Sequence, residues 1–344
     1  MWLTCSSIGR KFVMALTGIC LVLFVTFHVL MNAVALLWPA AYNVICAFLG
    51  ANWYALIASV GLAALFIIHI IYAMWLTVQN RRARGNDRYA VAGAAPGVEW
   101  SSKNMLVLGI VVLAFLVVHL IQFWAKMQLQ ELISHDLSAY PTVNDVPAAP
   151  EFGTLFLQAA FQNWWTPVIY IIGFIALWFH MNHGFWSMFH TIGWDNNTWL
   201  PRLRCIAGWW TSVVVLLFTA QAILFTIQAR NNYFLTAPAL QEQYGEYWSE
   251  KASDLIEEYQ KSFQSAVKQA EATGTEARMA QMDFLAETGD DYVARAEAIL
   301  SYAKAQAPEY ISAELSQLPQ FSNFVAQNSA QAKQLKGMKI ENNE

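Results

Sequence analysis

Four histidines lie at matching positions in four apolar segments of this 344-residue chain. Each follows the polar or aromatic residue that begins its segment by 16 or 17 residues. An imidazole without a partner is costly in hydrocarbon, so an ionisable side chain inside a membrane span indicates a functional site. The four are His28, His69, His119 and His180.

The equal spacing predicts two levels of histidine in a membrane bundle. Sixteen helical residues span about 24 Å, within a hydrocarbon core of about 30 Å. Successive spans run in opposite directions, so His28 and His119 fall near one face and His69 and His180 near the other, with the levels roughly 15–20 Å apart. Two imidazoles at each level predict two b-type haems, one on each pair, as an outer (distal) and an inner (proximal) site. Iron with two axial imidazoles has no position for dioxygen, which favours electron transfer.

Five segments are long enough to cross a membrane, which takes about 20 residues. They are residues 12–37, 53–78, 104–125, 165–189 and 207–229. The expected fold class is an all-α membrane protein with five transmembrane helices. Four of them form a haem-binding bundle, a fifth helix joins it, and a soluble helical C-terminal extension follows.

The connections between these segments carry Lys and Arg on alternating sides. One side holds Arg10, Lys11, Arg81, Arg82, Arg84, Arg88, Lys103, Arg202 and Arg204. The other has none in 38–52 and only Lys126 in 126–164. The positive-inside rule therefore predicts a cytoplasmic N-terminus and a C-terminal extension on the outer (periplasmic) side.

Three further histidines are weaker candidates. His183 lies one turn from His180 and competes with it as the ligand of that segment. Its position nearer the cytoplasm also suits a hydrogen bond to a haem propionate. His190 and His135 are expected to be structural. The alternative for the first four is that they are structural as well.

Charge divides the chain into two parts. Residues 1–230 hold 11 Lys and Arg against 7 Asp and Glu, whereas residues 231–344 hold 9 against 17. We therefore predict a five-helix transmembrane dihaem cytochrome b domain over 1–230 and an acidic helical extension over 231–344. Apolar positions at three- and four-residue spacings predict helices in the extension at 239–272, 275–306 and 309–336. Three such helices could form a small external bundle, cover the outer face of the membrane domain, or serve as a solvated spacer.

The four cysteines form no CxxC pair. This spacing does not support a zinc site, an iron–sulfur cluster or haem attached through a CxxCH motif.

The residues around the histidines resemble the dihaem cytochrome b membrane anchor of succinate:quinone oxidoreductases, the group of succinate dehydrogenases and fumarate reductases. The resemblance covers about residues 4–230 and rests on four runs: SSIGRKFVMALTG, NRRARGNDRYAV, EWSSKNMLVLG and FHMNHGFWSMFHTIGW. In relatives a glycine follows the ligand of the fourth helix by thirteen residues. His180 and Gly193 have that spacing and His183 does not, which favours His180.

The resemblance implies a complex in the bacterial inner membrane, within the respiratory chain and the tricarboxylic acid cycle. A cytoplasmic flavoprotein carrying FAD would handle succinate or fumarate, and an iron–sulfur subunit would pass electrons to the proximal haem. The distal haem would serve a quinone, expected to be menaquinone. This chain, which lacks a dinucleotide fingerprint, would be the anchor and electron-transfer subunit, with lipid and quinone around it, no succinate chemistry and no nucleic-acid partner.

The chain departs from its relatives in its acidic residues. Some relatives carry a glutamate two residues before the fourth ligand, where this chain has Trp178. Relatives can also place a quinol-binding acid between the first two helices, where this chain has none. Its quinone site is unassigned, and weak candidates are Asn32, Tyr42, Asn43 and Asn52.

Two other classes of protein compete with this interpretation. One is the dihaem quinone-reactive anchor of a hydrogenase or formate dehydrogenase, in which ligands tend to be shared unevenly among the helices. The other is a transporter or assembly protein, for which we expect intramembrane charges, broken helices or internal repeats. One histidine on each of four helices favours the succinate:quinone oxidoreductase anchor over the first class. The sequence shows none of the features expected of the second.

Overall fold

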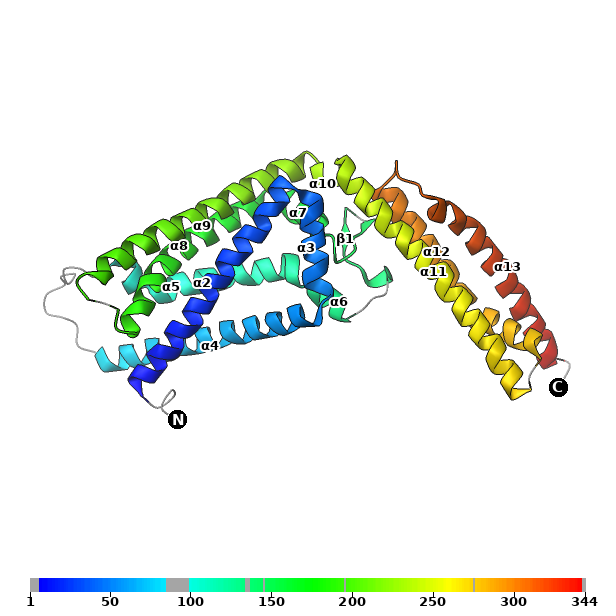
Figure 1. Ribbon diagram of the computed structural model, residues 1–344, viewed down its shortest axis with the longest axis horizontal. Helices are drawn as coiled ribbons and strands as arrows, with labels where there is room; N and C mark the ends of the chain where they lie inside the picture. The colour runs from blue at the N-terminus through cyan, green and yellow to red at the C-terminus, as the bar shows by residue number, and fades with distance from the viewer. Residues whose placement is uncertain are drawn as a thin grey trace. The chain divides into compact units, whose positions relative to one another are not determined.

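The computed structural model is helical over most of its described length, residues 6–84, 99–133, 137–144, 146–194, 196–274 and 276–341 (Figure 1). Arg88, His135 and most of the NRRARGNDRYAV run lie outside these residues. The chain divides into two compact units. Unit 1 comprises Met1–Ser134 and Pro150–Asn232, and unit 2 comprises His135–Ala149 and Tyr233–Glu344.

Unit 1 contains five helices that are long and apolar enough to cross a membrane. They are α2 (Ser7–Leu37), α4 (Trp53–Arg84), α5 (Trp100–His119) with the π-helix Leu120–Trp124 that continues it, α8 (Trp165–Thr191) and α9 (Trp199–Arg230). Each contains one predicted span, and α2 begins five residues before the predicted one. Its start is fixed by Ser6, whose hydroxyl accepts a hydrogen bond from the amide of Gly9 at 2.8 Å.

Three short helices complete unit 1: α3 (Pro39–Ala51), α6 (Gln128–Ile133) and α7 (Gly153–Phe161). α3 packs against α2, α4, α6 and α7, so these helices gather at one end of the bundle, here called the α3–α7 end. Asn43 joins two of them, because its side-chain oxygen accepts from the amide and the hydroxyl of Thr154 at 3.0 and 2.9 Å.

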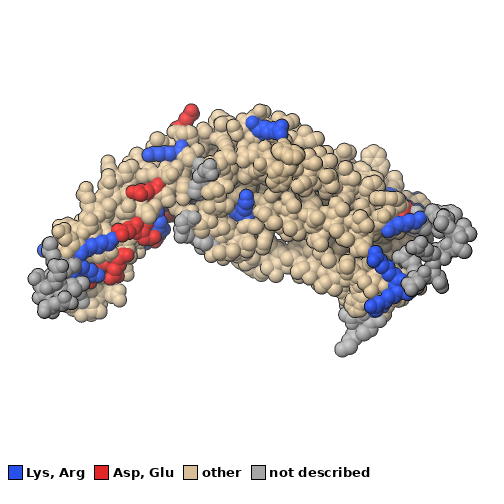
Figure 2. Space-filling view, turned by 180° about the vertical axis from the view of Figure 1, so that it is seen from behind, with Lys and Arg blue, Asp and Glu red and all other residues tan. Residues whose placement is uncertain are grey.

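The long helices pack around α8 and α2. α8 contacts α9, α5 and α2, and α2 also contacts α4 and α9. Large apolar side chains such as Leu23, Ile57 and Leu216 remain exposed on the outside of the bundle. On the face drawn in Figure 2, Lys and Arg gather at the end of unit 1 opposite α3 and α7, and its long side carries few charges. An apolar band of this size suits lipid and not water.

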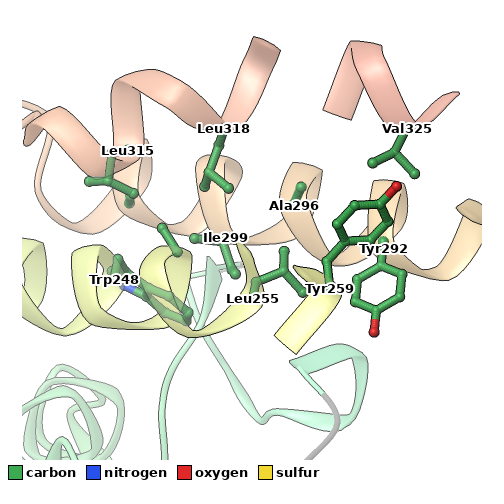
Figure 3. Close-up of a cluster of buried hydrophobic side chains, with 11 residues drawn as sticks. Trp248, Leu255, Tyr259, Tyr292, Ala296, Ile299, Leu315, Leu318 and Val325 are labelled. Atoms are coloured by element: carbon green, nitrogen blue, oxygen red, sulfur yellow. The ribbon is translucent and has the colours of Figure 1, made fainter. Parts of the chain in front are cut away.

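Unit 2 is built on three long helices, α11 (Pro238–Thr273), α12 (Ala277–Gln306) and α13 (Ala313–Glu341), with a short α10 (Tyr233–Thr236) before them. α11 ends at Gly274, which has a φ of 73° and so adopts the left-handed conformation usual after a helix. The three helices lie close to the predicted positions. Their shared buried cluster includes Trp248, Leu255, Tyr259, Tyr292, Ala296, Ile299, Leu315, Leu318 and Val325 (Figure 3).

This cluster makes the extension a packed bundle and not a solvated spacer. Trp248 is fully buried, and its indole N–H donates to the side-chain oxygen of Gln306 at 2.8 Å. The buried indole therefore has the polar partner that it needs.

Unit 2 also includes a part of the chain that precedes α7. Here a 3₁₀ turn (Leu137–Ala139) is followed by strands β1 (Thr142–Val143) and β2 (Val146–Pro147), which pair antiparallel. Leu137 and Tyr140 pack against the buried cluster of the three helices. The predicted division at residue 230 did not assign residues 135–149 to the same unit as the C-terminal helices. So short a segment has no periodic pattern of apolar residues that could indicate where it packs.

Truncating Leu318 tests whether the cluster holds unit 2 together. Leu318 is fully buried, so Leu318→Ala is expected to destabilise unit 2 by about 2–5 kcal/mol through lost contacts and a cavity. Hydrogen–deuterium exchange of the full chain in detergent would show faster exchange across α11–α13. Phe324→Ala, on the same helix but 56% exposed, is the matched control and should leave exchange unchanged. Equal effects of the two variants would contradict the packed core.

Candidate functional site: two histidine pairs

The structure brings four histidines of the spanning helices together as two pairs. The ring centres of His28 and His119 are 5.7 Å apart, with an angle of 84° between the rings. Those of His69 and His180 are 6.3 Å apart, at 66°. These are the pairs that the spacing in the sequence predicts.

Each pair joins two helices that are not consecutive in the chain. His28 lies on α2 and His119 ends α5, whereas His69 lies on α4 and His180 on α8. All four helices are therefore needed to assemble the two pairs. Apolar rings pack against His28. Its ring centre lies 5.4 Å from that of Phe24 and 6.1 Å from that of Phe218.

The spacing within each pair fits two imidazoles on opposite sides of one metal. A metal–imidazole bond is about 2 Å and the ring centre lies roughly 1 Å further, so the two ring centres would be about 6 Å apart. Two imidazoles are too few for a structural zinc ion, which takes four ligands. They are enough for iron that a porphyrin already holds by its own nitrogens. The described residues contain no group of three or more His, Cys, Asp or Glu that could hold a bare ion.

Hydroxyl groups contact one histidine of each pair. Nδ1 of His69 lies 3.1 Å from the hydroxyl of Thr17, and Nδ1 of His119 lies 3.2 Å from the hydroxyl of Tyr170. Nδ1 of His180 is buried and has no hydrogen-bond partner among the described residues. Backbone approaches it instead, because a Cβ at Gly109 would lie 3.5 Å from Cε1 of His180.

A π-helix follows His119 directly, over Leu120–Trp124. Such segments occur often at functional sites because they change the direction of the side chains that follow. Here Gln122 donates to the hydroxyl of Thr166 at 3.3 Å and accepts from the hydroxyl of Tyr170 at 2.8 Å. Sequence reasoning missed both Gln122 and Tyr170, because neither stands in a motif.

His183 faces a carboxylate of the protein. Its Nδ1 lies 3.3 Å from a carboxylate oxygen of Glu99, which precedes α5. The other oxygen of Glu99 lies 4.0 Å from Arg204. His183 therefore belongs to a small charged cluster and lies outside the two pairs. His190, expected to be structural, lies 6.3 Å from the ring of Trp186.

The polar residues suggested for a quinone site differ in the hydrogen bonds that they already make within the protein. Asn32 donates to the carbonyl of His28 at 2.9 Å and accepts from the hydroxyl of Tyr42 at 3.2 Å. Asn43 uses its side-chain oxygen to join α3 to α7. Asn52 donates to the carbonyl of Phe48 on the surface. Of the four, Asn32 and Tyr42 are linked to the backbone of His28 by these hydrogen bonds.

An acid from another part of the chain lies beside α3. The α3 segment has no acidic residue, but a side chain added at Gly50 would overlap the carboxyl group of Glu131 from α6. One oxygen of this carboxyl is buried without a hydrogen-bond partner among the described residues. Burial, with the nearby charge of Glu151 as a smaller cause, raises the pKa of Glu131 to about 7. Trp178, in place of a glutamate, donates to the hydroxyl of Ser212 at 3.0 Å.

Comparison of the chain with protein-family models, with characterised proteins and with solved structures gives no match. The fold defines a class, an all-α protein with five helices that could cross a membrane. Any more specific assignment must therefore come from the two histidine pairs and their surroundings.

The raised pKa of Glu131 predicts how stability depends on pH. Between its ordinary pKa of 4.5 and its folded pKa of about 7, the folded state holds more protons on this group than the unfolded state. Stability therefore falls as pH rises through that window, and the loss is complete above it. Glu131→Gln removes the titrating group. The melting temperature of this variant, relative to that of the wild type, should therefore be higher at pH 8 than at pH 5. Glu246→Gln, at an exposed position, is the control. An equal difference in melting temperature between Glu131→Gln and the wild type at both pH values would contradict the prediction.

Proposed function

We propose that this chain is the membrane anchor and electron-transfer subunit of a succinate:quinone oxidoreductase. In this role it carries two b-type haems between an iron–sulfur subunit and a quinone. The observation that carries the proposal is the meeting of His28 with His119 and of His69 with His180 inside the apolar helices. The resemblance of the flanking runs to that family supplies the reaction class.

The chain's own residues have defined tasks in this proposal. His28 and His119 would hold the distal haem, and His69 and His180 the proximal one. The haems, when bound, supply reversible one-electron transfer. Glycines such as Gly109 keep helix backbone close to the imidazoles, and rings such as Phe24 and Phe218 exclude water from His28. A dry, apolar site is one of the means by which a protein sets a haem potential.

The distribution of charge supports an orientation. The basic end of unit 1 would face the cytoplasm by the positive-inside rule, and the α3–α7 end would face outward. The iron–sulfur subunit and the flavoprotein would then dock at the basic end. Unit 2 follows α9 and would lie in the periplasm.

The α3–α7 end offers polar groups to a quinone. A quinone takes up protons when it is reduced and releases them when it is oxidised. Asn32 bonds the backbone carbonyl of His28, and Tyr42 bonds Asn32 in turn. The carboxyl of Glu131 can exchange protons near neutral pH. Menaquinone is the expected substrate by resemblance to the family.

Histidine variants test the assignment of ligands. The wild-type protein should contain two haems b per chain, measured as the pyridine haemochrome. His28→Ala or His119→Ala should remove the distal haem, and His69→Ala or His180→Ala the proximal one, since each iron loses an axial ligand. A redox titration distinguishes the two haems. His183→Ala is the control and should keep both, so loss of a haem in that variant alone would contradict the choice of His180.

The electron donor tests the reaction class. The complex purified through this subunit should show haem reduction on addition of succinate. A complex with two haems that responds to formate or hydrogen, and not to succinate, would keep the dihaem site and reject the succinate assignment. A wild-type chain with no haem would reject both.

A further inference from the structure

Two hydroxyl groups beside the histidine pairs each have another hydrogen-bond acceptor within reach. The Thr17 hydroxyl donates to backbone carbonyls one turn earlier, Val13 at 2.9 Å or Met14 at 3.1 Å. The Tyr170 hydroxyl donates to Gln122 at 2.8 Å. A hydroxyl has one proton, so while it donates to these groups its oxygen can contact a histidine only as an acceptor.

These bonds favour one tautomer of two imidazoles. With the hydroxyl protons donated to those acceptors, Nδ1–H of His69 donates to the Thr17 oxygen over 3.1 Å, and Nδ1–H of His119 donates to the Tyr170 oxygen over 3.2 Å. In a neutral imidazole the other nitrogen, Nε2, then has the free lone pair. Each pair thus contains one imidazole whose Nε2 is prepared to bind a metal.

The partner histidines are held differently. Nδ1 of His180 is buried without a hydrogen-bond partner among the described residues. His28 is packed between aromatic rings. Each pair therefore combines one imidazole held by a hydroxyl with one held by packing.

The two hydroxyls come from helices that carry ligands of the opposite pair. Thr17 lies on α2, eleven residues before His28, yet contacts His69. Tyr170 lies on α8, ten residues before His180, yet contacts His119. Ten or eleven helical residues span about 15–16 Å. α2 and α8 therefore each contribute a histidine at one level and a hydroxyl at the other.

We propose that Thr17 and Tyr170 are positioning residues of the two haem sites. Their hydroxyl oxygens accept hydrogen bonds from Nδ1–H of His69 and His119. These bonds hold each ring with Nε2 free for iron and increase the electron donation of the imidazole. A hydrogen bond of this kind raises the basicity of the ligand, which favours ferric over ferrous iron. The inference rests on the proposed function, because it requires haem at both pairs.

Valine and phenylalanine variants remove the hydroxyls and keep the shapes. Thr17→Val should raise the midpoint potential of the proximal haem and leave the distal one unchanged. Tyr170→Phe should raise that of the distal haem alone. Each variant is thus the matched control for the other, and Thr17→Ser should restore the wild-type potential. The measurement is a redox titration of the purified full chain, with the electron paramagnetic resonance signal of each ferric haem recorded alongside.

Each result decides between a positioning role and a packing role. Loss of the proximal haem in Thr17→Val, with retention in Thr17→Ser, also supports the hydroxyl, because outer contacts of this kind affect metal affinity 10–100-fold. Two haems with wild-type potentials in both single variants would overturn the proposal and leave the function intact. A shift of the wrong haem would overturn it as well. Absence of haem from the wild-type chain would instead reject the proposed function itself.

Discussion

Polar groups inside hydrocarbon need partners within the protein, and the packing of unit 1 depends on that constraint. Main-chain groups are satisfied along each helix, so the long side chains with polar ends decide how the helices contact one another. Gln221 of α9 donates to the carbonyl of Val29 on α2 at 2.9 Å. Gln158 of α7 donates to the carbonyl of Ala229 on α9 at 2.7 Å. These buried contacts fix which faces of the helices meet, and the histidine pairs lie in the same interior.

The constraint also links the two pairs to each other. α2 and α8 contact one another, and each contributes a histidine at one level and a hydroxyl group at the other. A shift of either helix would therefore change both pairs. The arrangement is nearly symmetric, because two helices supply histidines at each level. The hydrogen-bond partners differ, since one level has Thr17 and the other has Tyr170 with Gln122. If both pairs hold haem, as proposed, these environments would give the two haems different potentials.

The sequence predicted the elements well and the contacts between them in part. The five spans follow from long apolar runs, and the two pairs of histidines follow from equal counts along helices of fixed rise. The π-helix after His119, the position of Glu131 beside Gly50 and the network of Tyr170 were not predicted. Each depends on which residues from distant parts of the chain meet, and no periodic pattern records that. The start of α2 was missed for a local reason, because an apolar run does not include the polar turn that Ser6 caps.

The assembly of unit 2 from two separate parts of the chain has a consequence for biosynthesis. The hydroxyl of Tyr140 lies 3.5 Å from that of Tyr247, across 107 residues of sequence. At a synthesis rate of 5–20 residues per second, the first segment waits roughly 5–20 s for its partner to leave the ribosome. During that interval α8 and α9 must enter the membrane, and Leu137 and Tyr140 have no core to cover them. Unit 2 can therefore close only after the last span has been synthesised, which makes its folding a late step in the maturation of the whole chain.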